Sequence, residues 1–367
     1  MAARRLLITG GAGFIGANFA HYWAARHPDD RIVVFDRLTY AGNRASLESI
    51  EDHPSFRFVQ GDIVDTEAVR ALVREEDLDT VAHFAAESHV DRSITGPGEF
   101  IQTNLVGTWS MLEACRLEWP SDSERPFHFH HVSTDEVYGS LSPADPAFRE
   151  DKQYEPNSPY AASKAGSDHL VRAYHHTYGM SVTTSNCSNN YGPYQFPEKL
   201  IPLMIVNLLG GKDLPIYGDG SNVRDWLHVD DHCAGIEAVI ERGRVDQTYN
   251  IGGGNEWANI DLVRELCGLV DAVFASDPDL AARFPESRPS RGGSCSDSIQ
   301  FVTDRPGHDR RYAIDGSKIA GELGFEASIG FAEGLQATLA WYLTNEPWWR
   351  AVMDGSYRDW VAKQYQG

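Results

Sequence analysis

Short apolar runs alternate with amphipathic stretches through the first half of the chain. Five runs have the length and composition of buried strands: Arg5–Thr9, Arg31–Phe35, Phe56–Val59, Thr80–Phe84 and Phe127–Ser133. Between them, apolar residues recur at helical spacing in three stretches: Phe14–Arg26, Asp65–Arg74 and Phe100–Glu118. This alternation predicts an α/β fold in which helices cover both faces of a parallel sheet.

The regular alternation ends near residue 190. Before that point the pattern predicts a long helix at Ser158–Tyr178 and a strand at Ser181–Asn186. Beyond it Gly and Pro are frequent, and the predicted helices are Glu198–Leu209, Asp261–Val270 and Phe331–Asn345. The stretch Ser276–Ser298 is rich in Ser, Pro, Arg and Gly, which predicts a loop or a poorly ordered insertion. We expect two lobes with a ligand cleft between them: residues 1–190, with segments returning from about 225–255, and a smaller lobe over 191–367.

Composition and charge exclude several classes of partner. The chain has 367 residues, a composition ordinary for a globular protein and a net charge of −21, which argues against a nucleic acid or an anionic membrane as partner. No apolar run is long enough to cross a bilayer, and the N-terminus lacks the form of a signal peptide. The five cysteines form no C-x-x-C pair, so we expect no metal site of that kind and a reducing, cytoplasmic environment.

A glycine-rich turn lies between the first predicted strand and the first predicted helix. Residues 10–16 read Gly-Gly-Ala-Gly-Phe-Ile-Gly, and such a turn lets a pyrophosphate approach the backbone at a helix N-terminus. Asp36 ends the second strand, where a carboxylate binds ribose hydroxyls and repels a ribose phosphate. This favours NAD over NADP, although the neighbouring Arg37 could accept that phosphate. The first lobe is therefore predicted to be a Rossmann-type, doubly wound NAD-binding domain. The residues predicted to contact NAD are Gly10, Gly13, Phe14, Ile15, Gly16, Asp36, Asp62, Ile63, Ala85, Ala86 and Ser88.

Candidate catalytic residues follow the fifth strand. Thr134, Asp135 and Glu136 end that strand, and Tyr160 and Lys164 lie four residues apart at the start of a predicted helix, on one face. A lysine ammonium beside a phenol favours the phenolate and lowers its pKa, which suits a general base. Two adjacent carboxylates in a partly dry site can divide into an acid and a base. Their side chains diverge in an extended segment, so we expect a local turn there.

Several longer blocks carry a resemblance to a known family. They are residues 85–93, 186–194, 224–232 and 304–312. They add to the resemblance already indicated by the glycine turn, the Thr-Asp-Glu triplet and the Tyr/Lys pair. With them the chain resembles the extended short-chain dehydrogenase/reductases, and within these the dTDP-glucose 4,6-dehydratases. The resemblance covers nearly the whole chain and implies bound NAD, with dTDP-glucose as the small-molecule substrate.

The resemblance also implies a role for each catalytic residue. Tyr160 would take the proton of the sugar C4 hydroxyl while NAD accepts the C4 hydride, and Thr134 would hydrogen-bond the same oxygen. Glu136 would remove the C5 proton, and Asp135 would protonate the departing C6 hydroxyl. Return of the hydride to C6 would give a 4-keto-6-deoxy sugar nucleotide.

Further binding residues and a dimer are implied in the same way. Thr103, Tyr160 and Lys164 would also contact NAD. Asn259 could instead be only a helix N-cap, and the two roles can coexist. The helices near Phe100–Glu118 and Ser158–Tyr178 would form a four-helix bundle in a homodimer. The implied substrate-binding residues are Ser88, Thr134, Asn189, Lys199, Leu200, Pro215, Tyr217, Arg224, Asn259, Arg305 and His308.

Three other functions share parts of this pattern. A nucleotide-sugar 4-epimerase uses the same fold, NAD and Tyr/Lys pair but has no need of Asp135 and Glu136. A GDP-mannose 4,6-dehydratase would use NADP, against which Asp36 argues. A non-catalytic NAD sensor would not need the catalytic set. His128, His130 and His131 lie in the fifth strand without an acidic or cysteine set, so a structural role is predicted for them rather than a metal site.

Overall fold

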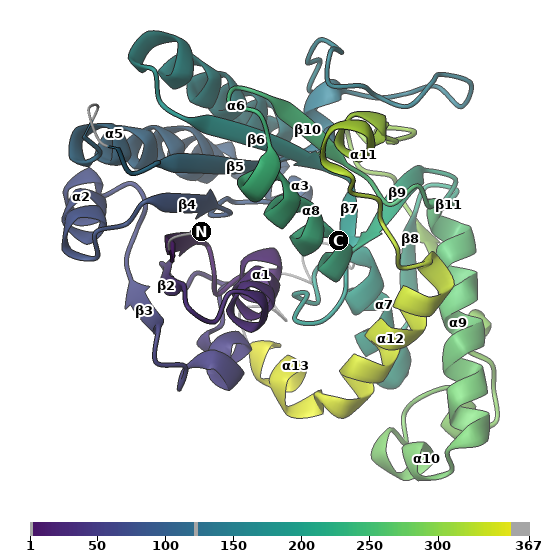
Figure 1. The fold of residues 1–367 in the computed structure, drawn as a ribbon. Coiled ribbons are helices and arrows are strands. Elements are labelled where there is room, and N and C mark those ends of the chain that lie inside the picture. The colour runs from purple at the N-terminus through teal and green to yellow at the C-terminus, as the bar shows by residue number, and fades with distance from the viewer. Residues whose placement is uncertain (1–2, 121–123, 354–367) are drawn as a thin grey trace.

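A seven-stranded parallel sheet forms the centre of the protein in the computed structural model, which describes residues 3–120 and 124–353 (Figure 1). The strands lie in the order β10-β6-β5-β4-β1-β2-β3, and every neighbouring pair is parallel. The order reverses between β1 and β4, which opens a crevice at the carboxyl ends of the strands. The predicted fold class is confirmed. The strands are β1 (Arg5–Thr9), β2 (Arg31–Asp36), β3 (Phe56–Gln60), β4 (Thr80–His83), β5 (His128–Thr134), β6 (Val182–Cys187) and β10 (Thr248–Ile251).

Helices cover both faces of this sheet, as the near-continuous apolar strands require. On one face, α1 and α8 pack together and bury Phe19, Trp23 and Ile236. On the other, α2, α5 and α6 bury Met111, Phe129 and Val171. The helices are α1 (Phe14–Arg26), α2 (Thr66–Glu75), α5 (Thr108–Glu118), α6 (Pro159–Tyr178) and α8 (Val229–Arg242).

The helix predicted at Phe100–Glu118 is present but changes its winding. It begins as α4 (Pro97–Phe100), continues through the π-helical segment η2 (Ile101–Gly107) and ends as α5. π-Helical turns are rare and are frequent at functional sites. This one contains Thr103, a predicted NAD contact, and periodicity at 3.6 residues cannot reveal it. The short helix α3 (Val90–Thr95) precedes it, and the one-turn segment η1 (Arg44–Ile50) follows β2.

The C-terminal half builds a second core and also returns to the first. Leu203, Leu266 and Leu335 lie in a separate buried cluster between its helices and two small sheets, of order β11-β9-β7 and β12-β8. Strand β10 joins the large sheet, and α13 lies beside η1, with Trp348 Nε1 donating to Ser46 Oγ at 3.1 Å (Figure 1). The division of the chain near residue 190 stays a prediction. The elements of this half are β7 (Asn189–Tyr191), α7 (Leu200–Leu209), β8 (Leu214–Tyr217), β9 (Val223–His228), β11 (Glu256–Ala258), α9 (Asn259–Ser276), β12 (Ile299–Val302), α11 (Ser317–Leu323), α12 (Phe331–Thr344) and α13 (Glu346–Val352).

The stretch predicted as a loop, Ser276–Ser298, is more structured than its composition indicates. It contains α10 (Asp279–Arg283) and the short turns η4 (Pro289–Arg291) and η5 (Cys295–Ser298). Leu280, Phe284 and Cys295 are buried in the C-terminal core, and a capping box at Ser294 holds the last turn. These few apolar residues hold the segment against the core. The overall composition of the segment is polar, so composition alone does not reveal them.

In the described part of the chain, no helix combines the length and apolar composition needed to cross a membrane.

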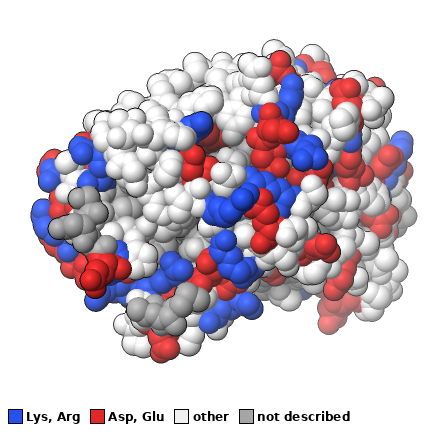
Figure 2. Space-filling model, turned by 45° about the horizontal axis from the view of Figure 1, so that its top comes forward, with Lys and Arg blue, Asp and Glu red and all other residues white. Residues whose placement is uncertain are grey.

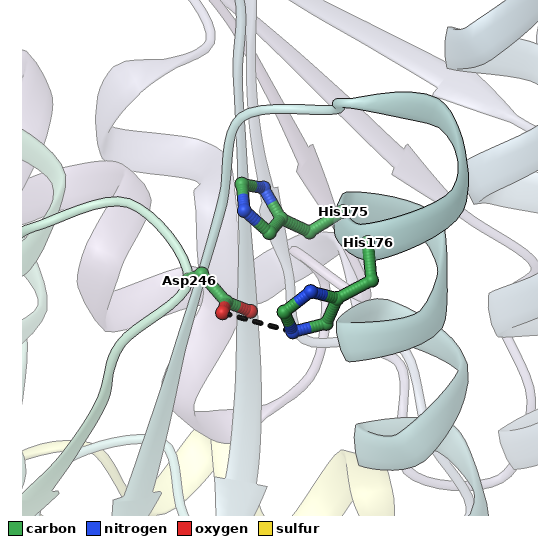
Figure 3. Close-up of side chains that lie close together, drawn as sticks. All are labelled: His175, His176 and Asp246. Atoms are coloured by element: carbon green, nitrogen blue, oxygen red, sulfur yellow. Dashed lines mark ion pairs between the residues drawn. The ribbon is translucent and has the colours of Figure 1, made fainter.

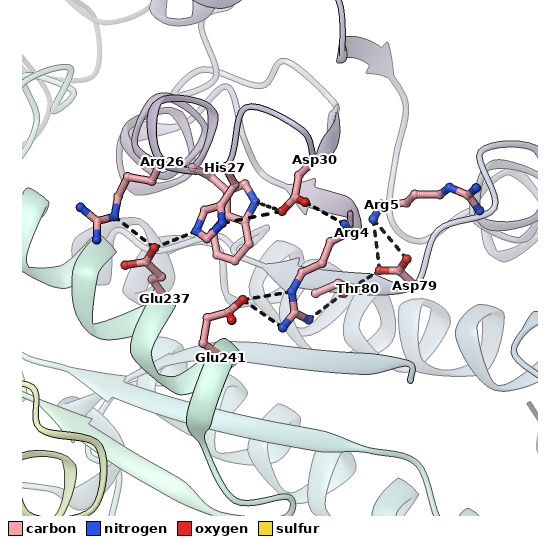
Figure 4. Close-up of polar contacts among 10 residues, drawn as sticks. Arg4, Arg5, Arg26, His27, Asp30, Asp79, Thr80, Glu237 and Glu241 are labelled. Atoms are coloured by element: carbon pink, nitrogen blue, oxygen red, sulfur yellow. Dashed lines mark hydrogen bonds and ion pairs between the residues drawn. The ribbon is translucent and has the colours of Figure 1, made fainter. Parts of the chain in front are cut away.

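A polar network joins the start of β1 to α1 and α8 (Figure 4). Asp30 accepts hydrogen bonds from the Arg4 backbone N–H at 2.8 Å and from Trp23 Nε1 at 2.9 Å. Glu241, from α8, accepts from Arg4 Nε at 3.0 Å, and Glu237 accepts from His27 Nε2 at 2.7 Å. The network ties the far ends of β1 and α1 together. The glycine turn connects these two elements, so the network also supports its position.

We expect Asp30→Ala to lower the free energy of unfolding by about 2–4 kcal/mol, because two buried N–H groups lose their acceptor. Urea denaturation followed by circular dichroism measures this. The matched control is Asp29→Ala, an exposed neighbour, which should change the free energy by less than about 0.5 kcal/mol. Equal effects of the two substitutions would contradict the role given to Asp30.

Candidate active site

A cavity of about 350 Å³ lies at the carboxyl ends of β1, β2, β4, β5 and β6 and reaches residues of the C-terminal half. Every residue predicted to contact NAD and every predicted catalytic residue lines it. Of the implied substrate-binding residues, Ser88, Thr134, Asn189, Lys199 and Leu200 also line it. The structure therefore brings together in one space groups that are spread over 190 positions, from Gly10 to Leu200.

The glycine turn forms one end of the cavity. Gly10 has φ +66°, and a Cβ there would lie 2.7 Å from the Ala85 backbone, so only glycine fits. Gly13 is the N-cap of α1 and provides no side-chain cap, so the first N–H groups of the helix, at Phe14 and Ile15, have no side chain bound to them from that position. An uncapped helix N-terminus beside a cavity is a site for a pyrophosphate.

Asp36 marks the adenosine end. Its carboxylate accepts the Ala12 N–H at 2.9 Å and the Leu38 N–H at 2.7 Å, and burial raises its pKa. Arg37, the residue that could have favoured NADP, forms an ion pair with Asp62 at 3.2 Å. The glycine turn, the uncapped helix and this carboxylate together fit NAD.

The turn expected after β5 is present. Thr134 is the N-cap of the one-turn helix η3 (Asp135–Tyr138), and its Oγ1 accepts the Glu136 N–H at 3.3 Å. The same hydroxyl lies 3.4 Å from Asp135 Oδ1. The turn brings both carboxylates to the cavity, which an extended strand could not do.

The two carboxylates have different electrostatic surroundings. Burial raises the pKa of Asp135 well above its ordinary value, and Glu136 and Asp225 raise it further. Burial also raises the pKa of Glu136, but Arg305, Lys199 and Arg224 oppose that rise. Asp135 therefore stays protonated more readily than Glu136, and its Oδ2 is buried without a hydrogen-bond partner in the described structure. This difference suits an acid at Asp135 and a base at Glu136.

The surroundings of Tyr160 differ from the sequence-based expectation. Burial raises the pKa of Tyr160 well above its ordinary value, with Glu136 adding to the rise, whereas Lys164 was expected to lower it. Lys164 instead donates to Val132 O at 2.9 Å. The pKa of Tyr160 is raised and not lowered because the phenol is buried and loses its contact with water. The Lys164 ammonium does not offset this effect, since its proton donor is turned toward the strand.

Six implied substrate-binding residues do not line the cavity: Pro215, Tyr217, Arg224, Asn259, Arg305 and His308. They belong to the C-terminal half. Arg224 and Arg305 still act on the charge of Glu136 from beside the cavity.

The two arginines are held by other groups in this structure. Arg305 pairs with Asp91 at 2.6 Å, and Tyr217 donates to the same carboxylate at 3.2 Å. Arg224 donates to the backbone carbonyls of Val223 and Asp309. Both cations are thus fixed by hydrogen bonds next to the cavity.

Asn259 is not an N-cap. It is the first residue of α9, Ala258 precedes it as cap, and the Asn259 Oδ1 atom is buried without a hydrogen-bond partner in the described structure. The alternative that Asn259 serves as cap is therefore wrong.

Sequence reasoning missed several residues of the cavity wall. Gln195 Oε1 and Trp226 Nε1 are buried there without a hydrogen-bond partner among the described residues, so both have unused capacity to bind a ligand. No local motif distinguishes them. The other missed lining residues include Thr39, Gly42, Glu87, Cys187, Ser188, Asn190, Phe196 and Glu198.

The histidines of β5 have two environments. His128 and His130 bond hydroxyls of Ser181, Thr183 and Ser185, in or beside β6, in line with the structural role predicted. His131 points to the other face of the sheet, toward α6.

One group of side chains elsewhere has the composition of a metal site. His175 and His176, at the end of α6, approach Asp246, with ligand atoms within 4.8 Å of one another (Figure 3). His176 Nε2 pairs with Asp246 at 3.1 Å and His175 Nδ1 with Met180 O at 2.8 Å. Ordinary ion-pair and backbone contacts account for these positions, and we assign no metal to them.

Fold and cavity together define an NAD-dependent enzyme of the extended short-chain dehydrogenase/reductase class that acts on a nucleotide sugar. Comparison with known proteins narrows this. Residues 7–338 match the family model for GDP-mannose 4,6 dehydratase. A dTDP-glucose 4,6-dehydratase of Xanthomonas campestris pv. campestris is 54% identical over 356 residues, which cover 96% of this chain and 97% of that protein.

Two solved structures show how similar the chain is to a dehydratase and to an epimerase. DesIV, the dTDP-glucose 4,6-dehydratase of Streptomyces venezuelae with NAD bound, is 47% identical with a TM-score of 0.82, covering 95% of this chain and 99% of DesIV. A UDP-glucose 4-epimerase of Thermus thermophilus is 26% identical with a TM-score of 0.77, covering 93% and 99%. The chain belongs to the dTDP-glucose 4,6-dehydratase family.

We expect Gly10→Ala to weaken NAD binding at least about tenfold, about 1.4 kcal/mol. The added Cβ would meet the Ala85 backbone at a positive φ, which displaces the turn. The NAD content of the purified variant and its dissociation constant measure this. Gly98→Ala is the control, because a Cβ there meets nothing within 4 Å. Normal NAD binding by Gly10→Ala would contradict the placement of the turn against the cofactor.

Proposed function

We propose that this chain converts dTDP-glucose to dTDP-4-keto-6-deoxyglucose and water with NAD as its resident cofactor, using Tyr160, Lys164, Thr134, Asp135 and Glu136. The observation that carries the assignment of residues is the unequal pair Asp135 and Glu136 in the same cavity as Tyr160. When bound, NAD supplies the chemistry of hydride acceptance from C4 and hydride return to C6.

The first proton transfer falls to Tyr160. Its phenolate oxygen takes the proton of the sugar C4 hydroxyl and becomes a phenol, and the Thr134 hydroxyl beside it orients the sugar oxygen. Burial opposes the phenolate, and we assign to the Lys164 cation, which lines the same cavity, the role of favouring it. The 4-keto group that results makes the C5 proton acidic.

Elimination then falls to the two carboxylates. Glu136, kept ionised by three nearby cations, takes the C5 proton, and Asp135, kept protonated by burial, gives its proton to the departing C6 hydroxyl. Water leaves, and Glu136 returns its proton to C5. A 4-epimerase has no step that would require this pair.

The nucleotide end of the substrate is assigned to the C-terminal half. Arg224, Arg305 and Lys199 are the cations beside the cavity, and charge-assisted hydrogen bonds to a diphosphate are strong. Asn259 Oδ1 and Trp226 Nε1 are buried polar atoms with capacity to spare in the same region.

Substrate labelled with deuterium at C4 tests the function. We expect dTDP-glucose so labelled to give a 4-keto-6-deoxy product with deuterium at C6, because one hydride moves from C4 to C6 within a turnover. Mass spectrometry and proton NMR of the product measure this. An epimerised sugar, or no turnover by protein that holds NAD, would contradict the function.

Glu136→Gln should separate oxidation from elimination. The amide cannot take the C5 proton, so we expect kcat to fall about 10²–10⁴-fold while C4 oxidation still occurs and NADH absorbance accumulates on the enzyme. Asp135→Asn is the companion variant and should retain C5 proton exchange with solvent. If ketone formation is lost in Glu136→Gln and no NADH accumulates, Glu136 acts in the first step and the assignment is wrong.

We also propose that two chains associate through α5, α6 and the adjoining segment η2. Ile101, Trp109 and Leu117 are spaced eight residues apart and are 45%, 43% and 46% exposed. Tyr178, at the end of α6, is 53% exposed. Figure 2 has few charged side chains at its upper left, on the side where Figure 1 places α5 and α6. A surface that is poor in charge and carries several exposed apolar side chains favours an interface between two copies. The cytoplasmic location expected from the cysteines stays a prediction.

The double variant Trp109→Glu/Leu117→Glu should shift the protein from dimer to monomer, since it places charge in the apolar surface. Analytical ultracentrifugation measures the mass. Phe301→Glu is the control, because Phe301 is 58% exposed on β12, outside that surface, and should leave the mass unchanged. A wild-type chain that sediments as a monomer would overturn the proposed dimer.

A further inference from the structure

A third ionisable side chain, Asp168, follows Tyr160 and Lys164 on α6. The three are spaced four residues apart, so phenol, ammonium and carboxylate form a row along one face of the helix. Lys164 is 4% exposed and Asp168 is 6% exposed. Lys164 lines the catalytic cavity, whereas Asp168 borders a second cavity of about 410 Å³. The row therefore runs from the catalytic cavity into the protein.

Three consecutive residues of β5 hold this row. Val132 O accepts a hydrogen bond from Lys164 Nζ at 2.9 Å, and Ser133 Oγ donates to Asp168 Oδ2 at 2.9 Å. His131 Nε2 lies 3.1 Å from Asp168 Oδ1 and 3.4 Å from Lys164 Nζ. The imidazole thus stands between the ammonium and the carboxylate, immediately before the strand reaches the catalytic triplet.

The ring of His131 is a neutral bridge and not a third charge. Burial and the nearby Lys164 hold its pKa well below the ordinary value. The same ring nitrogen also lies 3.2 Å from Ser167 Oγ, and one nitrogen cannot donate to one neighbour and accept from Lys164 at once, so the position of a single proton decides which neighbour it binds. His83, whose ring stacks on His131 at 5.4 Å, is kept neutral by burial in the same way.

Asp168 is the group that opposes the loss of charge on Lys164. Burial lowers the pKa of Lys164, and among the groups that raise it Asp168 comes first, followed by the Cys187 thiol. Burial raises the pKa of Asp168 to about 6, opposed first by Lys164 and then by Ser133 and Tyr154. His169 acts on the pKa of Asp168 in the same direction as Lys164. The ammonium and the carboxylate of the row each favour the charged form of the other.

We propose that Asp168, acting with His131, is a positioning residue for Lys164: it holds the ammonium in place beside the catalytic cavity and keeps it charged. This rests on the proposed function, in which Lys164 acts as a cation beside Tyr160. In this role Asp168 touches neither substrate nor cofactor. Its effect reaches the cavity through His131 and Lys164.

The test is Asp168→Asn, which keeps the shape and removes the charge. At pH values above the lowered pKa of Lys164, where the ammonium has lost its proton, we expect kcat for dTDP-glucose to fall about tenfold or more, with little change in KM. The alkaline limb of the pH–rate profile should move to lower pH, because an ammonium without its carboxylate loses its proton more easily. A carboxylate with a merely structural role would leave the profile where it is.

Thermal unfolding separates the two roles without a substrate. The pKa of Asp168 is higher in the folded protein than in the unfolded chain, so its ionised form costs stability above about pH 6. We therefore expect the unfolding temperature of Asp168→Asn, relative to that of the wild type, to rise as the pH is raised from about 4 to about 6. Asp231→Asn is the control. Asp231 is a buried carboxylate of α8 that accepts the Ser328 and Ile329 N–H groups, and its loss should lower the unfolding temperature without moving the pH profile.

Chemical rescue provides a third readout. Asp168→Ala leaves a gap beside the second cavity, and formate should restore part of kcat where chloride at equal ionic strength does not. A wild-type pH profile in Asp168→Asn would overturn the proposal. If the wild-type protein fails to turn over dTDP-glucose, the proposed function fails, and the pH dependence of unfolding still shows whether Asp168 ionises beside Lys164.

Discussion

Burial of ionisable side chains where β5 meets α6 is the constraint on which the rest of the site depends. Tyr160, Lys164, Asp135 and Asp168 are each less than a tenth exposed, and each is moved by desolvation away from its charged form. A charge can persist there only beside an opposite charge or a directed hydrogen bond. Every residue of β5 from His131 to Thr134 accordingly contacts one of these groups or turns the chain toward them.

The same constraint explains the division of labour between the carboxylates. Neighbouring acids in a dry site resist being charged together. Arg305, Lys199 and Arg224 lower the pKa of Glu136, whereas only Arg224 of these three is among the main influences on Asp135. Those cations come from the C-terminal half, so the acid and the base become distinct only when that half is folded against the sheet. The NAD end needs no such help, because the glycine turn, α1 and Asp36 are held within the first lobe.

The relation to the 4-epimerases follows from this arrangement. The two overall structures superimpose with a TM-score of 0.77 at 26% identity, so this chain and the 4-epimerase share one fold. Elimination requires an added acid and base of unequal proton affinity, and these reside in one turn after β5 together with the cations that face it. A small local change therefore separates two chemistries on one scaffold.

The sequence by itself determined the fold class and the family and indicated NAD as the cofactor, because these are encoded in periodicity and in short motifs with local geometry. It also predicted the five catalytic residues, and the structure places all five at one cavity. The π-helical turn at Thr103, the ordered Ser276–Ser298 segment, and the wall residues Gln195 and Trp226 were decided only by the tertiary structure. So was the direction of the pKa shift at Tyr160. Each of these depends on desolvation or packing by segments distant in the chain, and proximity in space is a quantity that no local pattern records.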